Sequence, residues 1–236
     1  MITLMMAALL SFAPHPVDTY TAKDGKEISY VMFGHGSVAV AYDGKVVYID
    51  PVSSEADYSA LPKADVVLVT HAHGDHYDAE AIKTLAPKTL ITTPEVGEKE
   101  PSAKVMRNGE SLTVGDWLTV EAVAAHNTTE GRSNFHPKGR DNGYVLTIGG
   151  ERIYVAGDSE PQPDMLAQKG MDVVFLAVNQ PYTMTPEQAA EVINTIEPEV
   201  FYPYHFGGSG QPTDLDKLQK LITTKKTKMI VHPCLE

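Results

Sequence analysis

The sequence contains a single cysteine, Cys234, so a disulfide bond within the chain is excluded. Basic residues are also few: 19 Lys and Arg stand against 31 Asp and Glu, which gives a net charge of −12. A duplex or RNA ligand requires a basic surface on the protein. The charge balance therefore argues against a nucleic acid as the main partner and favours a small-molecule substrate.

The sequence also lacks a hydrophobic run long enough for a membrane span. Ile2–Ala13 is uncharged and mostly apolar, but its twelve residues match a secretory h-region rather than a transmembrane helix. Ser11-Phe12-Ala13 provides small residues at the usual cleavage spacing. We expect residues 1–20 to be a signal-peptide remnant and lead-in of an exported, periplasmic protein. In the alternative, the protein is cytoplasmic and keeps this segment in its core.

The rest of the chain has the composition of one globular domain, expected at residues 21–236. Hydrophobic residues make up 42% and charged residues 21% of the chain, as is usual for a globular protein. Its length of 236 residues is enough for one well-buried domain and too short to add a second of ordinary size. Asp43-Gly44 and Gly149-Gly150 are typical hairpin turns. Strands are expected at 28–33, 37–42, 45–49, 65–70, 89–92, 111–114, 117–125, 143–148, 151–155, 172–175 and 229–231, and helices at 78–85, 185–197 and 213–221. Strands followed by helices in each half favour two mixed sheets with helices outside.

One short loop concentrates groups that bind metals. His71, His73, Asp75 and His76 fall within six positions, directly after the strand-like run Asp65–Val69. Imidazole nitrogen suits Zn and Fe, and a carboxylate admits harder ions such as Mn. Four candidate ligands from one loop, with more histidines downstream, indicate a pair of metal ions rather than one.

Three further candidate ligands also follow strand-like runs. His126 comes after Leu118–Ala125, Asp158 after Arg152–Gly157, and His205 after Val200–Tyr204. Side chains at the ends of neighbouring strands converge when the strands lie side by side. The sequence therefore predicts that these groups gather with the first loop.

With this pattern the chain resembles the metallo-β-lactamase superfamily, in which an H-x-H-x-D-H loop, a later His, an Asp in a "GD" turn and a final His bind two metals. More narrowly, it resembles a branch of Zn-dependent hydrolases that includes L-ascorbate-6-phosphate lactonase-like proteins. The supporting stretches are Phe33–Ser37, Ile49–Pro51, Phe135–Gly139, Gly157–Ser159 and Tyr182–Thr185. The resemblance implies an α/β fold, a four-layer αββα sandwich of two mixed β-sheets flanked by helices.

The resemblance also implies a ligand set. Metal one is expected on His71, His73 and His126, metal two on Asp75, His76 and His205, and Asp158 between them. Many relatives with a similar Phe135–Gly139 segment carry Tyr at the position of His126. His126 is nevertheless our first choice for the third ligand, with His136 as its rival or as a substrate contact.

Other residues are given supporting roles. Asp75 is expected to accept a proton or orient the nucleophile, and His35, between two glycines, to line the pocket. Asp50, at the end of a strand, is expected to orient a ligating histidine, with a plain turn residue as the alternative. His136, Arg132 and Lys138 are candidates for recognising an anionic group of the substrate, with a solvated loop as the alternative.

The leading functional hypothesis is a hydrolase that cleaves an ester, lactone or phosphodiester with a hydroxide bridged by two divalent ions. Zinc is the first choice of metal, with Mn or Fe as alternatives. A di-iron redox enzyme on the same fold is disfavoured, because the flavodiiron members of the superfamily use Glu where this chain has His73. A drug-hydrolysing β-lactamase is disfavoured because its main class has Cys at the position of Asp158 and lacks the equivalent of His76. A non-enzymatic metal-binding protein is the remaining alternative.

Overall fold

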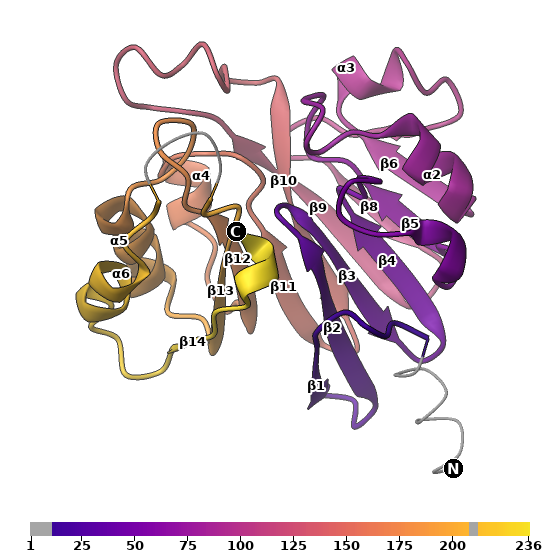
Figure 1. Cartoon of the computed structure of the whole chain (residues 1–236), viewed down its shortest axis with the longest axis horizontal. Helices are drawn as coiled ribbons and strands as arrows, with labels where there is room; N and C mark the ends of the chain where they lie inside the picture. Colours follow the sequence, from indigo (N-terminus) through magenta and orange to yellow (C-terminus); the bar gives the residue numbers. More distant parts are fainter. Residues whose placement is uncertain (1–10, 208–211) are drawn as a thin grey trace.

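The computed structural model describes residues 11–207 and 212–236, so most of the predicted secretory segment, and the loop at 208–211, lie outside the described residues. Two seven-stranded β-sheets face each other, and helices cover their outer surfaces (Figure 1). This is the four-layer αββα sandwich with two mixed sheets that the sequence predicted, so the fold prediction is confirmed.

The two sheets are built in the same way. Each begins with antiparallel strands and ends with parallel ones, in simple chain order. The first sheet contains β1 (Val17–Thr21), β2 (Glu27–Gly34), β3 (Ser37–Tyr42), β4 (Lys45–Ile49), β5 (Val66–Leu68), β6 (Thr89–Thr92) and β7 (Lys104–Val105). The second contains β8 (Ser111–Val114), β9 (Leu118–Ala125), β10 (Asp141–Ile148), β11 (Glu151–Val155), β12 (Val173–Ala177), β13 (Val200–Tyr204) and β14 (Lys228–Met229).

Short helices occupy the outer layers. Helices α2 (Ala79–Leu85) and α3 (Pro94–Gly97) lie on the side of the first sheet, and α4 (Pro163–Leu166), α5 (Pro186–Ile196) and α6 (Leu215–Leu221) on the side of the second (Figure 1). Two 3-10 turns, η1 (Tyr58–Ala60) and η2 (Pro233–Leu235), complete the elements. Thr185 and Gln188 form a capping box at the start of α5, as their spacing predicted.

Strand β1 begins inside the segment that the sequence analysis assigned to a lead-in. Val17 to Thr21 pair antiparallel with β2, so the first sheet starts earlier than predicted. Both predicted hairpin turns are present: Asp43 and Gly44, and likewise Gly149 and Gly150, have positive φ at both central positions. That is the backbone of a type I′ turn, which suits the twist of the flanking strands.

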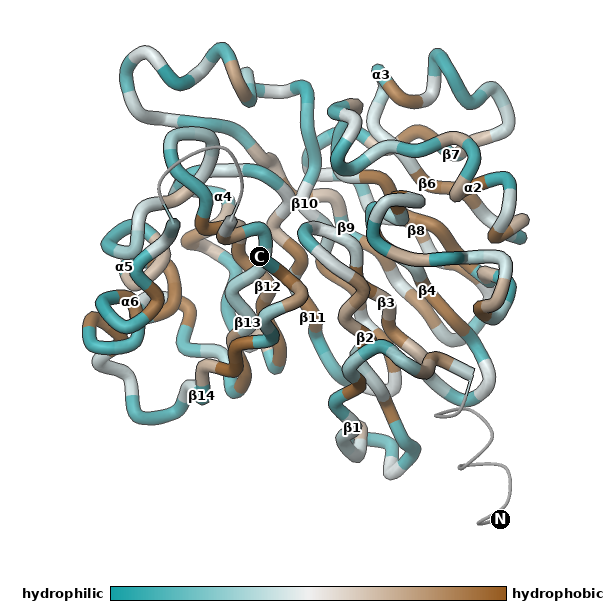
Figure 2. The backbone as a smooth tube through the Cα atoms, in the orientation of Figure 1, coloured by the Kyte–Doolittle hydropathy of each residue, from teal (hydrophilic) through white to brown (hydrophobic). Residues whose placement is uncertain are grey.

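Alternate residues of the inner strands enter two hydrophobic layers. In β4, Val47 and Ile49 belong to the core between the sheets, whereas Val46 and Tyr48 pack in a second cluster with Leu85 of α2. Figure 2 shows that hydrophobic residues are concentrated along the strands. Burial on both faces makes these strands rigid supports for the loops at their ends.

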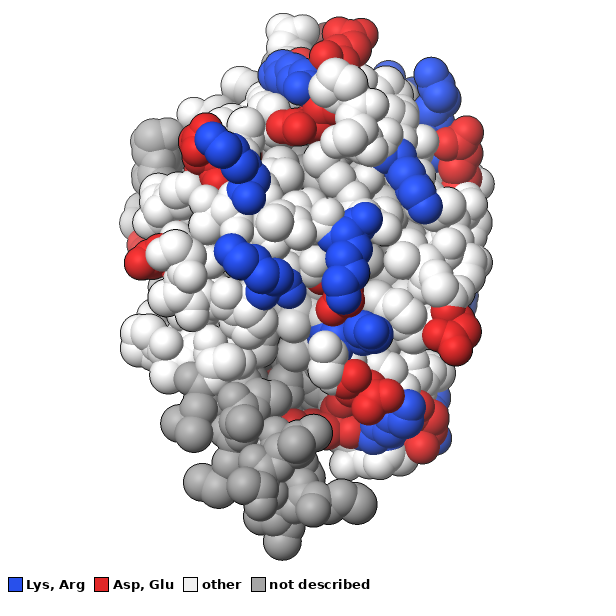
Figure 3. All heavy atoms as spheres, turned by 90° about the vertical axis from the view of Figure 1, so that its right-hand side faces the viewer, with Lys and Arg blue, Asp and Glu red and all other residues white. Residues whose placement is uncertain are grey.

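The surface that carries α2 and α3 mixes charges of both signs (Figure 3). Lys83 lies 3.4 Å from Glu80 on α2, and Lys88 lies 2.7 Å from Asp65. Interspersed charges of this kind do not build a large field of one sign. Among the described residues, no helix has the length and apolarity needed to cross a membrane.

Candidate metal centre

The loop with three histidines follows the carboxyl end of β5, an inner strand of the first sheet, and a buried carboxylate fixes the start of this loop. The backbone N–H and the hydroxyl of Thr70 donate to Asp50 at 2.7 and 2.6 Å. The N–H of His76 donates to the carbonyl of His73 at 3.0 Å, which turns the loop back on itself. The loop therefore presents all its candidate ligands to one point.

Asp158 lies at the centre of the cluster that results. Its carboxylate oxygens are 3.3 Å from His76 Nε2, 3.4 Å from His205 Nε2, 3.5 Å from His136 Nε2 and 3.9 Å from His71 Nε2. All five side chains are nearly fully buried. One carboxylate thus contacts four imidazoles that come from three separate parts of the chain.

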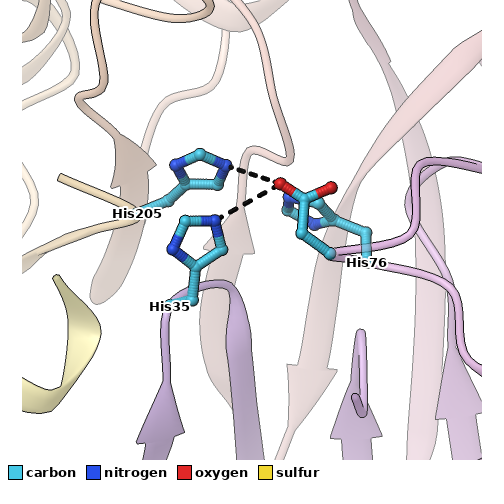
Figure 4. Close-up of side chains that lie close together, drawn as sticks. His35, His76 and His205 are labelled. Atoms are coloured by element: carbon cyan, nitrogen blue, oxygen red, sulfur yellow. Dashed lines mark hydrogen bonds and ion pairs between the residues drawn. The ribbon is translucent and has the colours of Figure 1, made fainter. Parts of the chain in front are cut away.

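The candidate ligand atoms of the described residues form three sets, and one of them, which contains His71, His76 and Asp158, shares a histidine with each of the other two. In the first set, His71, His73 and His136 offer nitrogens that all lie within 4.8 Å of one another. In the second set, atoms of His35, Asp75, His76 and His205 do the same. Within this set, His35 Nε2 and His205 Nε2 lie 3.4 and 3.5 Å from Asp75 Oδ2. Figure 4 shows the rings of His35 and His205 side by side, both turned toward one carboxylate oxygen.

Most of the imidazoles are held from behind. Each of four rings turns Nε2 toward the cluster while its Nδ1 meets a polar partner. For three of them this partner is an oxygen that can accept the Nδ1–H, as is typical of metal-binding histidines, and for His205 it is an amide nitrogen. The pairs are His71 with Thr70 Oγ1 at 3.0 Å, His76 with Asp50 Oδ2 at 2.8 Å, His136 with Asp141 Oδ2 at 3.2 Å, and His205 with the Asn179 amide at 3.2 Å. Asp50 therefore stands where the sequence analysis placed it, behind a candidate ligand.

Several atoms at the centre have no hydrogen-bond partner. Among the described residues, His76 Nε2, His205 Nε2 and Asp158 Oδ1 are buried and lack one. Buried polar atoms are rarely left in this state, because desolvation without a partner is costly. Imidazole nitrogens and carboxylate oxygens that converge in this way fit divalent metal ions such as Zn, Mn or Fe.

Three residues of the centre have left-handed backbone conformations, which non-glycine residues seldom adopt. His35, Asp50 and His205 have φ of 48°, 46° and 49°. Such conformations cost about 1–2 kcal/mol each and persist where the surroundings enforce them. Here the N–H of His205 donates to the His35 carbonyl at 3.2 Å, and the N–H of His35 donates to the Cys234 carbonyl at 3.1 Å. These hydrogen bonds hold the backbone of His35 and His205 in a strained conformation that directs both rings into the cluster.

His126 is not a member of these sets, and its rival His136 is the histidine that lies with His71 and His73. Two hydrogen bonds fix the backbone of His126. Its N–H donates to Ser159 Oγ at 3.0 Å, and its carbonyl accepts from the N–H of Glu160 at 3.1 Å. Burial, followed by the charge of Lys138, lowers the pKa of His126, while Asp164 of α4 opposes the shift. The charged groups near its ring are therefore outside the metal centre.

Comparison with known proteins identifies the family. Residues 27–205 match the family model of the β-lactamase superfamily domain. The chain is 32% identical over 193 residues to a UPF0173 metal-dependent hydrolase of Thermus thermophilus, in an alignment that covers 76% of this chain and 83% of that protein. The chain belongs to the UPF0173 metal-dependent hydrolases of the metallo-β-lactamase superfamily.

Solved structures support this assignment. A protein from Parabacteroides distasonis, described as a metal-dependent hydrolase, is 40% identical, has a TM-score of 0.87, and is matched over 92% of this chain and 98% of its own. A metallo hydrolase of Ignicoccus hospitalis, 23% identical with a TM-score of 0.75 over 89% of this chain and 96% of its own, shares the fold. The protein is therefore a metal-dependent hydrolase with a buried His and Asp cluster suited to its metal.

The basic residues predicted to meet the substrate of this hydrolase have other contacts. Arg132 Nη1 lies 3.1 Å from Glu160, a fully buried carboxylate. Lys138 is exposed and is not among the residues that line the cavity at the cluster. His136 does line that cavity, but as a member of the first ligand set. The anionic-substrate contacts proposed for Arg132 and Lys138 are thus not supported by their positions.

The sequence analysis missed several residues of the hydrolase site. Asp141 and Asn179 hold ligand imidazoles, and Tyr182 lines the cavity. Asp141 opens β10 and Asn179 lies two residues beyond β12, so the same search for polar residues at strand ends could have found both. Tyr182 carried no such signal.

The metal-free cluster should carry protons that metal binding displaces. Burial lowers the pKa of His205, but Asp158 and Asp75 outweigh it and raise the pKa to about 10, and Asp158 and Asp50 likewise raise the pKa of His76 above its usual value. Burial raises the pKa of Asp158, but His205 and His76 hold it well below its usual range. Without a bound metal, the His205 ring is thus charged at neutral pH, and the His76 ring keeps its proton to a higher pH than an ordinary imidazole.

Because a ligating imidazole must be neutral, zinc binding at pH 7 should release protons, and the apparent affinity should rise as the pH increases toward 10. Calorimetric titration in buffers of different ionisation enthalpy measures the number released. A binding enthalpy that does not depend on the buffer would contradict this prediction.

Gly36 has a specific role because its Cα faces the ring of His76. A Cβ at this position would lie 2.7 Å from His76 Cε1 and 3.1 Å from its Nδ1. We expect Gly36→Ala to displace the ring and to weaken zinc binding about 10–100-fold, measured by competition with a chromophoric chelator. Gly74→Ala is the matched control within the ligand loop, because a Cβ there meets nothing within 4 Å. Equal losses in the two variants would refute the role of Gly36.

Proposed function

We propose that this hydrolase binds two divalent metal ions, zinc first among them, and cleaves an ester, lactone or phosphodiester bond in a small molecule. The observation that carries the proposal is the position of Asp158, whose carboxylate contacts His71 and His136 of one ligand set and His76 and His205 of the other. A carboxylate in that position can bind a metal ion with each of its two oxygens.

In this proposal each set of residues holds one ion. His71, His73 and His136 hold the first, Asp75, His76 and His205 the second, and Asp158 both. Two ions held in this way would lower the pKa of a shared water toward about 7 and stabilise negative charge on the oxygen of the attacked group. The buried carboxylates of Asp50 and Asp141 hold the rings of His76 and His136 in fixed orientations.

We assign proton-transfer roles to two further side chains at the cavity. Asp75 is half-exposed at the cavity, and its Oδ2 lies 3.4 Å from His35 Nε2. His35 lines the same cavity, and its Nδ1 is held by the carbonyl of Glu236 at 3.2 Å. We assign Asp75 to orient the nucleophile and accept its proton, and His35 Nε2 to deliver a proton to the leaving oxygen.

The proposal is tested by turnover of generic lactones, aryl esters and phosphodiesters with zinc-loaded protein. We expect hydrolysis of at least one class, and its loss on chelation and in His71→Ala. His232→Ala is the control, since His232 pairs with Asp18 at 2.9 Å away from the cluster. Turnover that survives both chelation and His71→Ala would remove the metals from the mechanism.

A further inference from the structure

The cavity beside the metal centre is lined by two kinds of residue. It has a volume of about 300 Å³. Six of its lining residues belong to the ligand cluster: His35, His73, Asp75, His136, Asp158 and His205. The others are an amide, Asn179, and two aromatic residues, Phe135 and Tyr182. Among the described residues that line the cavity, these three lie outside the His and Asp cluster, so they can contact a part of the substrate distant from the reacting bond.

Phe135 and Tyr182 form one aromatic surface although they come from separate loops. Their rings meet edge to face, with centroids 4.9 Å apart and planes at 75°. Both side chains are partly exposed, and both border the cavity. Aromatic faces of this kind favour flat apolar groups through burial and ring contacts.

Hydrogen bonds hold the two loops in fixed positions. The side-chain amide of the buried Asn127 donates to the Tyr182 carbonyl at 2.7 Å, and its backbone N–H donates to the His136 carbonyl at 2.9 Å. Arg140 Nη2 donates to the Phe135 carbonyl at 2.8 Å. An aromatic surface fixed in advance loses little entropy on binding, which favours its use in recognition.

The guanidinium groups nearest this surface are already paired. Arg140 donates to both oxygens of the buried Asp141 at 2.7 and 2.8 Å, and Arg132 pairs with Glu160 at 3.1 Å. Pairing of this kind leaves them poorly placed to bind a phosphate or carboxylate of a substrate. The part of a substrate that reaches Phe135 and Tyr182 would therefore have to be desolvated against aromatic faces, which penalises a charged group.

We propose that the substrate is a small uncharged ester or lactone whose flat apolar part lies against Phe135 and Tyr182. The inference rests on the proposed function and narrows its three bond types to carboxylic esters and lactones. In the reaction, water adds across the acyl C–O bond: the acyl carbon gains the hydroxyl group, and the leaving oxygen gains the proton.

The test compares dihydrocoumarin, δ-valerolactone and bis(p-nitrophenyl) phosphate with zinc-loaded protein. We expect kcat/KM to be highest for dihydrocoumarin and lowest for the phosphodiester. Phe135→Leu and Tyr182→Leu should each lower kcat/KM for dihydrocoumarin about tenfold and leave δ-valerolactone nearly unchanged. Trp117→Leu is the control, because Trp117 lines a separate cavity with Gly149 and Gly150. Equal losses for the two lactones, or a preference for the phosphodiester, would overturn the inference.

A binding measurement separates this inference from the proposed function. Calorimetry with zinc-loaded protein should show phenylacetate binding more tightly than acetate, and Phe135→Leu should abolish the difference. If this preference is found but no substrate is hydrolysed, the recognition surface stands and the hydrolytic proposal fails. If hydrolysis occurs and phenylacetate binds no better than acetate, the hydrolytic proposal stands and this inference fails.

Discussion

Replacing His136 with alanine should remove one of two bound metal ions and lower turnover by more than about a hundredfold. The reason is the position of His136. Its Nε2 lies 3.5 Å from the Asp158 carboxylate, and one of its ring nitrogens lies within 4.8 Å of ring nitrogens of both His71 and His73. Loss of a residue behind a ligand already costs about 10–100-fold, so loss of a ligand should cost more. Metal content by mass spectrometry and kcat/KM for the best substrate measure the effect.

His126→Ala is the matched control for this variant. His126 is also a buried histidine at an end of the same connection between β9 and β10, but its ring lies outside both ligand sets. We expect His126→Ala to keep two metal ions and most of the activity. The opposite outcome, loss of metal in His126→Ala and retention in His136→Ala, would restore the sequence-based assignment and refute the present one.

Chelation is the second change expected to have a large effect. Asp158 and four nearly fully buried imidazoles lie in contact at the centre, and several of their polar atoms have no hydrogen-bond partner within the protein. An ion present at a thousand times its Kd stabilises the folded state by about 4 kcal/mol, which corresponds to roughly 10 °C in Tm for a chain of this size. We therefore expect a chelator to abolish turnover and to lower Tm by at least about 10 °C.

Calorimetry with and without chelator measures this change in Tm, and added zinc should restore both Tm and turnover. Gly36→Ala supplies a control of intermediate affinity, because it disturbs one ligand ring by contact with a new Cβ. Its Tm at a fixed zinc concentration should lie between those of the loaded and chelated protein. A Tm that does not respond to chelation would show that no metal contributes to the folded state.

Local sequence patterns predicted most of the fold and much of the site. The hydrophobic strands of both sheets, the turns at Gly44 and Gly150, and the start of α5 depend on short-range chemistry that a sequence displays. The H-x-H-x-D-H loop is equally local. Asp158 and His205 follow strands β11 and β13, and rigid neighbouring strands carry their side chains to one edge.

The choice between His126 and His136 could not be made in this way. Strands β9 and β10 are antiparallel neighbours, with Ala125 opposite Asp141, so their connection starts and ends at the same edge. Either histidine could reach the centre from there. Contacts with Ser159 and Glu160, more than thirty residues away along the chain, decide which one does.

The pairing of Arg132 could not be predicted for a similar reason. A cluster of basic residues in an acidic chain suggests anion recognition, but Arg132 pairs with Glu160, 28 residues further along. Glu160 also accepts the backbone N–H groups of Thr128 and Thr129 at 2.8 and 2.6 Å. Because Glu160 is distant from this loop in the sequence, the residues of the loop alone do not reveal that their polar groups are paired with it.

The central claim is that distant parts of the chain gather around a shared pair of metal ions. Anomalous diffraction at the zinc edge from crystals of the zinc-loaded protein tests it most directly. The account predicts two anomalous peaks, one beside His71, His73 and His136 and the other beside Asp75, His76 and His205, with Asp158 contacting both. A single peak, or a peak beside His126 instead of His136, would contradict it.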